Sequence, residues 1–198
     1  RALAGAPLAD EAVRLARTTN DLFCLAIALA SQGVLSLVMG DYDRARTTLE
    51  ERVVTGRQAG DAWAIALPLR NLAIIASREG DYATARDLLA ESLRGLRALG
   101  EKWFLSRSIE TLGAVAAWQG EHERAAHLFG AAERLRDAVG ASVLPFYRAD
   151  YDAAVAAART ALGPSLFERC WREGHAMTPE AAVAYALGED HTCESSSA

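Results

Sequence analysis

The residues best suited to chemistry in this sequence are its histidines and cysteines, and their spacing argues against a reactive site. His122 and His127 are five residues apart, so on a helix they diverge and cannot share a metal ion. His191 and Cys193 offer only two ligands in a polar tail, which is fewer than a structural zinc site needs. The cysteines are scattered, which excludes a disulfide framework and favours a reducing, cytoplasmic setting. Cys24 lies in an apolar run and is expected to be an inert core thiol.

The sequence motifs of common enzymes are also missing. The chain has no Gly-x-Ser-x-Gly elbow and no Gly-x-x-x-x-Gly-Lys-Ser/Thr loop. We therefore expect no catalytic residues, no cofactor and no metal, and we predict that the chain is not an enzyme. The net charge is −5 and basic residues form no run, so a phosphate backbone would be repelled. Direct contact with nucleic acid is not expected.

The elements that must position any functional side chain are repeated every 40 residues. Three blocks, 21–60, 61–100 and 101–140, align without gaps. Each block opens with an acidic residue, has an aromatic residue two positions later, a glycine and an acidic residue at its middle, and a closing glycine. The matched positions are Asp21, Asp61 and Glu101; Phe23, Trp63 and Trp103; Gly40-Asp41, Gly80-Asp81 and Gly120-Glu121; and Gly60, Gly100 and Gly140.

Each block is expected to form two antiparallel helices, roughly 21–39 and 41–58 in the first block. The glycines fall where the chain must turn through positive φ, and the aspartates after them are good N-caps. The aromatic column, Phe23, Trp63 and Trp103, is expected to pack hairpin against hairpin. The uncharged stretch Leu22–Gly40 is close to the ~20 residues of a membrane span. The repeat explains it better as a first helix, so no membrane is expected.

The recurring positions resemble the tetratricopeptide pattern, in which a small residue of the first helix precedes Gly-Asp/Glu-Tyr, an alanine and a large apolar residue. The matching sets are Gly33, Gly40, Asp41, Tyr42, Ala45 and Leu49; Ala73, Gly80, Asp81, Tyr82, Ala85 and Leu89; and Gly113, Gly120, Glu121, His122, Ala125 and Phe129. The resemblance implies an all-α fold, a right-handed α-solenoid of antiparallel helix hairpins. Two departures are a period longer than the family's usual ~34 residues and a missing proline, where Arg57, Arg97 and Asp137 stand.

The two ends depart from the repeat. Residues 1–20 are expected to be a partial hairpin, in which Glu11–Thr19 is a second helix and Asn20 replaces the closing glycine. Since the chain begins with Arg1 rather than methionine, we expect it to be part of a longer protein. Residues 141–188 are predicted to be a helical C-terminal cap of the solenoid, and residues 189–198 a disordered tail.

Residues 120–188 resemble a narrower group, the C-terminal repeat region of large ATP-dependent bacterial transcriptional regulators of the LuxR and MalT type. The runs that carry the resemblance are Leu128–Arg136, Arg148–Tyr151, Trp171–Gly174 and Thr178–Leu187. In that family a nucleotide-binding domain precedes the repeats, a helix-turn-helix domain often follows them, and the repeats act as a sensor and interaction arm. The resemblance therefore implies that ATP-binding and DNA-binding modules lie elsewhere in the full-length protein.

The best candidates for binding are first-helix residues on the concave face of the array. They are Ile27, Val34, Leu67, Arg70, Ile74, Arg78, Arg107, Glu110 and Trp118. The face is apolar in the first block, so we expect a cover: a missing N-terminal hairpin, the C-terminal helices, a second chain or an apolar ligand. Arg70 and Arg78 beside Trp118 could hold an acidic group, or Arg70 could pair with Glu110 in a solvated ion pair.

These observations predict a non-catalytic repeat domain of a bacterial regulator. It would bind a partner protein, another copy of itself or a small effector. The alternative is a repeat scaffold of another multidomain signalling protein, linked to a cyclase or a kinase. Only the sequences that flank this chain in its gene would separate the two.

Overall fold

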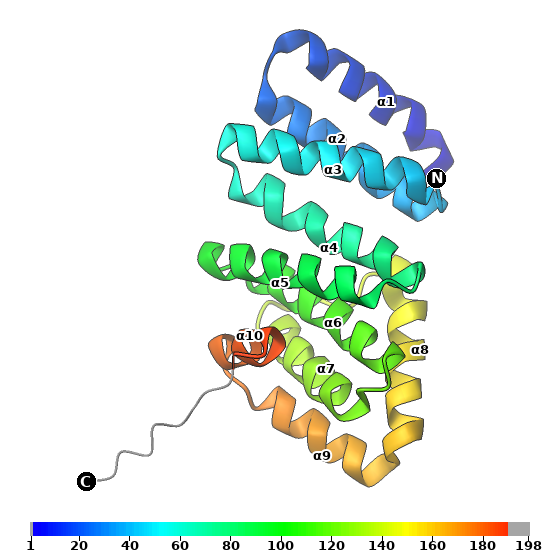
Figure 1. Cartoon of the computed structure of the whole chain (residues 1–198), viewed down its shortest axis with the longest axis vertical. Coiled ribbons are helices and arrows are strands. Elements are labelled where there is room, and N and C mark those ends of the chain that lie inside the picture. The colour runs from blue at the N-terminus through cyan, green and yellow to red at the C-terminus, as the bar shows by residue number, and fades with distance from the viewer. Residues whose placement is uncertain (1, 190–198) are drawn as a thin grey trace, which may run out of the picture.

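The computed structural model describes residues 2–189, which form ten α-helices and no β-strand. Helices α1 to α7 follow one another along the long axis of the molecule, and each contacts the next (Figure 1). The fold is thus an all-α solenoid. The helices are α1 (Ala2–Thr19), α2 (Leu22–Met39), α3 (Tyr42–Ala59), α4 (Ala62–Arg78), α5 (Tyr82–Leu99), α6 (Lys102–Trp118), α7 (His122–Asp137), α8 (Pro145–Leu162), α9 (Pro164–His175) and α10 (Pro179–Leu187).

The turns between helices follow the predicted chemistry. Gly40 and Gly60 end their helices in the left-handed region, with φ of 80° and 66°. Asn20 does the same with φ of 55°, which confirms its match to the closing glycines. The side chains of Asp21 and Asp61 each accept two backbone N–H bonds at the start of the following helix. In the first two blocks, local sequence therefore determines where the helices start and stop.

The third block is capped differently from the first two. Glu101 and Glu121 stand where the earlier blocks have aspartate, and neither side chain caps its helix. The extra methylene of glutamate makes it a poorer N-cap than aspartate. The boundaries of α6 and α7 are nevertheless kept, so packing between helices sets them there.

The repeated small and large residues make the core of each hairpin. Leu49 and Phe129 are fully buried. A Cβ atom added to Gly33 would lie 2.7 Å from Leu49 Cδ2, and one added to Gly113 would lie 2.8 Å from Phe129 Cε1. The small residue of the first helix thus makes room for the large residue of the second. The repeated large residues, Leu49, Leu89 and Phe129, thus fill space within their own hairpins as well as between hairpins.

The arginines at the position of the missing proline form ion pairs along the outside of the stack. Arg57 pairs with Glu91 at 3.1 Å, and the equivalent Arg17 pairs with Glu51 at 2.8 Å. Both pairs join neighbouring repeats and are exposed, so each contributes little alone. At this position the partial hairpin and the first block thus have an arginine that contacts the next repeat, where the family pattern has a proline.

Two core predictions for the first block are wrong. Phe23 is 63% exposed, and Cys24 is exposed rather than a core thiol. The aromatic column packs as predicted only further along, where the rings of Trp63 and Phe104 lie 5.5 Å apart, edge to face. Ala64 stands in the second block where Phe104 stands in the third, so Phe23 has no equivalent ring to pack against.

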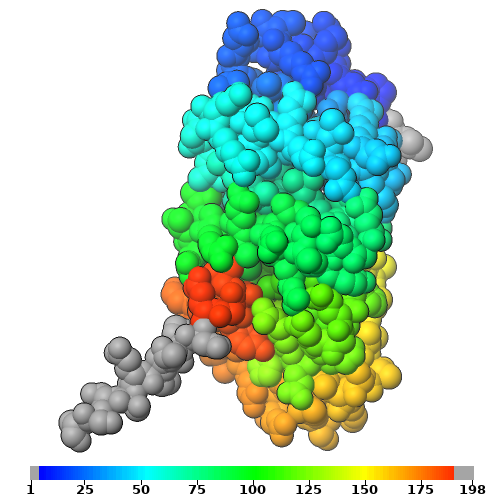
Figure 2. All heavy atoms as spheres, viewed as in Figure 1, coloured from blue at the N-terminus to red at the C-terminus, as the bar shows by residue number. Residues whose placement is uncertain are grey.

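The C-terminal helices surround the last repeats on several sides. Helix α8 runs roughly along the long axis, across the direction of the repeat helices, and contacts α6 and α7. Helix α9 packs on α7, and α10 contacts α5, α6 and α7. Gly130 and Gly174 allow α7 and α9 to touch, since an added Cβ on Gly130 would lie 2.1 Å from the Trp171 carbonyl oxygen. Figure 2 shows the repeats as successive bands, with α10 against the later ones.

Residues at both ends of the described chain take part in the fold. Helix α1 begins at Ala2, so it is longer than the predicted helix Glu11–Thr19. Glu189 pairs with Arg97 at 2.9 Å. The rest of the predicted disordered tail, 190–198, lies outside the described residues.

Among residues 2–189, one helix is long and apolar enough to cross a membrane by length and composition. It is α2, and 33% of it is buried in the fold. Core helices of soluble proteins pass the same test, so the observation does not by itself indicate a membrane span.

Candidate functional site

Two cavities lie where the start of α8 meets the face formed by α2, α4 and α6. The first has a volume of about 320 Å³ and is called here the Trp118 cavity; its walls include Arg70, Ile74, Arg78, Glu110, Trp118 and Tyr147. The second has a volume of about 350 Å³ and is called the Arg52 cavity; its walls include Val34, Arg52, Leu67, Arg70, Arg107 and Tyr147. Volumes of this size are typical of sites for small molecules.

The structure brings together most of the predicted concave-face residues. Eight of the nine line one cavity or the other, and Ile27 lines neither and is 53% exposed. Of the covers predicted for the first block, the C-terminal helices do not supply one within residues 2–189, because α8 packs on α6 and α7 and only its start reaches the cavity lined by Val34. That these residues bind a partner or an effector stays a prediction.

Tyr147, near the start of α8, separates the two cavities. The Arg70 guanidinium lies 4.4 Å from the centre of its ring, and that of Arg107 lies 5.3 Å away. The Tyr147 hydroxyl donates weakly to Asn71 Oδ1 at 3.4 Å. Arg70 and Arg107 are on neighbouring first helices, so one aromatic ring of the C-terminal region joins two repeats.

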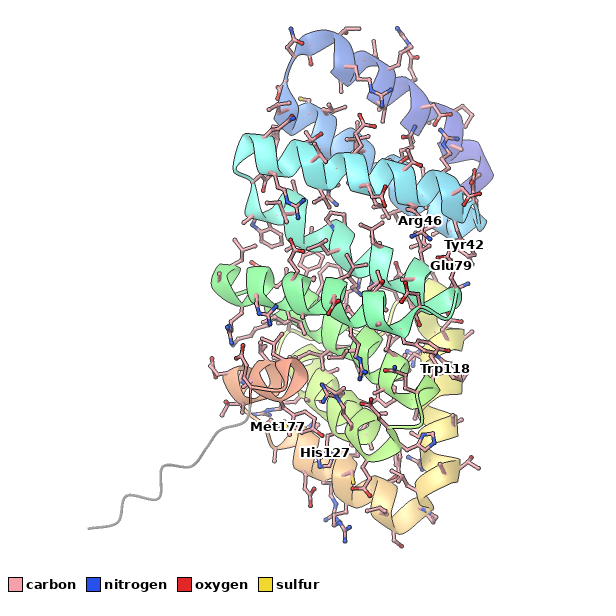
Figure 3. The ribbon with its side chains drawn as sticks, viewed as in Figure 1. Tyr42, Arg46, Glu79, Trp118, His127 and Met177 are labelled. Atoms are coloured by element: carbon pink, nitrogen blue, oxygen red, sulfur yellow. The ribbon has the colours of Figure 1, made fainter. Side chains whose placement is uncertain are left out.

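Apart from Arg70, which lines both cavities, the charged residues around the Trp118 cavity are paired within the protein. Arg78 donates to Asp150 of α8, and Glu110 accepts from Arg136 of α7. Glu110 is only 8% exposed, and burial raises the pKa of its carboxyl above the ordinary value, against the opposing effect of Arg136. Trp118, the last residue of α6, lines this cavity (Figure 3 labels it).

The structure bears on both alternatives predicted for these arginines, the held acidic group and the solvated pair of Arg70 with Glu110. Arg70 forms no ion pair with Glu110; its Nε donates to the Arg107 carbonyl oxygen at 3.0 Å, and its side chain is buried rather than solvated. Arg78 does hold an acidic group, but the group is Asp150 of the same chain. The sequence could not reveal this, since Asp150 is 72 residues away and outside the repeat.

The charges around the Arg52 cavity are not matched. Three guanidinium groups, those of Arg52, Arg70 and Arg107, line it, and no aspartate or glutamate does. Burial lowers the pKa of Arg52, and burial together with the nearby charge of Arg70 lowers the pKa of Arg107. Arginines stay cationic at neutral pH despite such shifts, so the cavity concentrates positive charge.

Arg52, Tyr147 and Asp150 were missed because candidates were taken only from first helices. Arg52 lies on a second helix, where the other two blocks have Ser92 and Ala132. A charged residue in a column of small residues is a detectable signal, and the same column comparison would have found it. No such signal marks Tyr147 or Asp150, because α8 has no repeat register.

One group of side chains has the chemistry of metal ligands. Ligand atoms of His127, Cys170 and Glu173 lie within 4.8 Å of one another, between α7 and α9 (Figure 3 labels His127). His127 Nε2 lies 2.9 Å from Glu173, and its Nδ1 lies 2.8 Å from the Glu123 carbonyl oxygen. These hydrogen bonds account for the cluster as a contact between helices. Burial raises the pKa of the Cys170 thiol, which disfavours the thiolate that binds metals.

Comparisons with known proteins give a partial similarity. The chain is 41% identical over 59 residues to proteins of Mycobacterium tuberculosis and Mycobacterium bovis that carry the name of HTH-type transcriptional regulators. The similarity covers 30% of this chain and 7% of the length of each relative. No family model and no solved structure matches the chain. The chain thus has weak partial homology to regulators, over a small part of their length.

Proposed function

We propose that this chain is part of the non-catalytic sensor and interaction arm of a bacterial transcriptional regulator, similar to the repeat region of LuxR- and MalT-type proteins. The observation that carries the proposal is the groove itself. Its walls combine first helices of successive tetratricopeptide-like repeats with α8 of the C-terminal region. A molecule bound there would contact both parts at once.

Such an arrangement suits a sensor because binding would be coupled to the position of α8. A ligand changes a conformational equilibrium only if it interacts differently with the two states. Here the differential contact would be the one with Tyr147 and its neighbours, which is lost if α8 moves off the groove. The partial similarity to HTH-type transcriptional regulators supports a regulatory setting.

The other functions of a regulator would belong to other parts of the protein. We propose that ATP binding and DNA binding reside in modules outside this chain, and that the protein works in the cytoplasm. Within the chain, the repeats would occupy 1–140 and the helical cap 141–188. The groove would receive a small effector, a partner protein or a second copy of the chain.

The first test is an assay of the purified chain for ATP hydrolysis and for a shift of double-stranded DNA in a gel. We expect neither activity, and ATP turnover would contradict the proposal.

The second test is thermal unfolding in the presence of a metabolite collection. A true effector should raise the unfolding midpoint of the natural chain and have a much smaller effect on Arg70→Ala and Trp118→Ala. Sequencing the gene on both sides would separate the regulator from a cyclase- or kinase-linked scaffold.

A further inference from the structure

Arg52 is placed where the repeat normally has a small, uncharged residue. The equivalent Ser92 is fully buried, and its hydroxyl donates to the Ala66 carbonyl oxygen at 2.8 Å. The equivalent Ala132 is fully buried as well. Arg52 brings a guanidinium to this interior position and remains only 9% exposed. A buried charge is costly unless it is paired, so its presence needs a reason.

Nothing among residues 2–189 forms an ion pair with Arg52. Its Nε is buried and has no hydrogen-bond partner. The acidic residue that influences it is Asp61, and both bonds of the Asp61 cap go to the backbone N–H groups of Trp63 and Ala64. The Arg52 side chain is thus a buried donor with unused capacity that lines a cavity.

The same cavity holds two further cations. Arg107 stacks on Tyr147 and Trp103 rather than on a carboxylate. Arg70 donates from Nε to the Arg107 carbonyl oxygen at 3.0 Å and makes a long contact of 3.5 Å from Nη1 to Asn71 Oδ1. Its Nη2 has no hydrogen-bond partner among the described residues, so the guanidinium can still donate to another acceptor. The nearest glutamate on this face, Glu110, is already held by Arg136. Three guanidiniums around one cavity without a lining carboxylate is the arrangement that an anion would stabilise.

The remaining walls of the cavity are mostly apolar, with Asn71, Ser92 and Ser108 as polar exceptions. The apolar residues include Val34, Val38, Leu67, Phe104 and Phe146. Val34 and Phe146 are also partly open to solvent, at 37% each, so an apolar group bound there would remove their surface from water. The volume of about 350 Å³ holds a small molecule and not a folded segment. Charge and shape together describe a ligand with one anionic end and one apolar end.

We propose that the Arg52 cavity binds a small amphipathic organic anion. Its carboxylate or phosphate head contacts the guanidiniums of Arg52, Arg70 and Arg107, and its aliphatic or aromatic body packs against Val34, Leu67 and Phe146. Arginine is suited to this role because its planar fork matches both head groups. The inference deepens the proposed sensing function and rests on it for its biological meaning, but the binding itself is tested independently.

The test uses the whole chain and calorimetry with octanoate, phenyl phosphate, inorganic phosphate and, as the neutral control, octanamide. We expect octanoate or phenyl phosphate to bind and octanamide not to bind. Binding of inorganic phosphate as tight as that of phenyl phosphate would refute the apolar half of the site. If none of the anions binds at millimolar concentration, the proposal is wrong.

Two variants locate the site. Arg52→Ser inserts the residue that the second repeat has naturally, so the fold should tolerate it, and Arg107→Gln removes a second cation. Each should weaken binding at least about tenfold, the usual effect of losing a charge-assisted hydrogen bond. Arg57→Ser is the matched control, since it removes an exposed arginine from the same helix. Equal weakening by Arg57→Ser would show a nonspecific charge effect and overturn the assignment.

Failure of this inference and failure of the proposed function give different results. A chain that binds none of the anions, and that still lacks ATP hydrolysis and DNA binding, refutes the anion site alone. A chain that hydrolyses ATP refutes the proposed function, whatever the cavity binds.

Discussion

The two cavities share a wall but differ in how their charges are satisfied. Arg70 and Tyr147 line both. In the Trp118 cavity the remaining charges pair within the protein, Arg78 with Asp150 and Glu110 with Arg136. In the Arg52 cavity the cations face no carboxylate. The difference shows that Asp150 of the C-terminal region supplies an acidic partner in one half of the groove, while no acidic residue lines the other half.

The largest effect on stability should come from removing one partner of the buried ion pair at the Trp118 cavity, Glu110 with Arg136. Arg136→Ala leaves Glu110 buried without its partner and should lower the free energy of unfolding by about 3–5 kcal/mol at neutral pH. Urea denaturation followed by circular dichroism measures it.

The same variant should show a dependence on pH. Burial raises the pKa of Glu110 above its ordinary value of 4.5, so its protonated form is favoured in the folded state. Its contribution to stability is therefore greatest below pH 4.5 and declines as the pH rises through the raised pKa. The deficit of Arg136→Ala should accordingly shrink in acid, because Glu110 then takes up a proton. An equal loss of unfolding free energy at neutral pH and in acid would contradict the pairing of Glu110 with Arg136.

A smaller effect should follow from removing the wall between the cavities. Tyr147→Ala loses the contacts of its ring with Arg70 and Arg107 and should cost about 2 kcal/mol of unfolding free energy. The control is Tyr147→Phe, which keeps the ring and loses only the long bond to Asn71, and it should stay within about 0.5 kcal/mol of the natural chain. If both variants cost the same, the hydroxyl and not the ring holds α8.

Removing a charge from the Arg52 cavity should stabilise the protein, whereas removing one from the Trp118 cavity should destabilise it. In the absence of any ligand, Arg52→Ser removes a buried, unpaired charge and should raise the free energy of unfolding by about 1 kcal/mol. Arg57→Ser should change it by less than about 0.5 kcal/mol, since its pair is exposed. A loss of stability in Arg52→Ser would mean that packing of the arginine stem outweighs the cost of its charge.

The smallest effect on stability should come from removing the acidic partner of Arg78 in the Trp118 cavity. Asp150→Asn frees Arg78 from an exposed ion pair and should cost less than about 1 kcal/mol. It should also give the Trp118 cavity a second cation without an acidic partner, Arg78 in addition to Arg70. Phosphate should then raise the thermal midpoint of Asp150→Asn more than that of the natural chain. An identical response in both proteins would show that Arg78 does not hold the anion.

Much of the fold could be predicted because it depends on short-range chemistry that recurs. The turns at Gly40 and Asn20 and the caps at Asp21 and Asp61 are local, and three blocks in one register repeat the same signals. The concave face followed from the same register. The exposure of Phe23 was not predicted. A residue that recurs at one repeat position is buried only if the neighbouring repeat supplies a side chain to pack against it, and beside Phe23 that residue is the small Ala64.

The sequence by itself determined the helical hairpins, the face on which Arg70 and Arg107 lie, and the signal at Arg52, because helical period and repeat register depend only on spacing along the chain. Only the tertiary structure decided that α8 crosses this face and that Asp150 satisfies Arg78. Pairing of charges depends on which distant segment arrives beside them, and α8 lies outside the repeat. For that reason the sequence predicted the first-helix cations of the groove, Arg70, Arg78 and Arg107, and the fold alone showed which of them remain without an acidic partner.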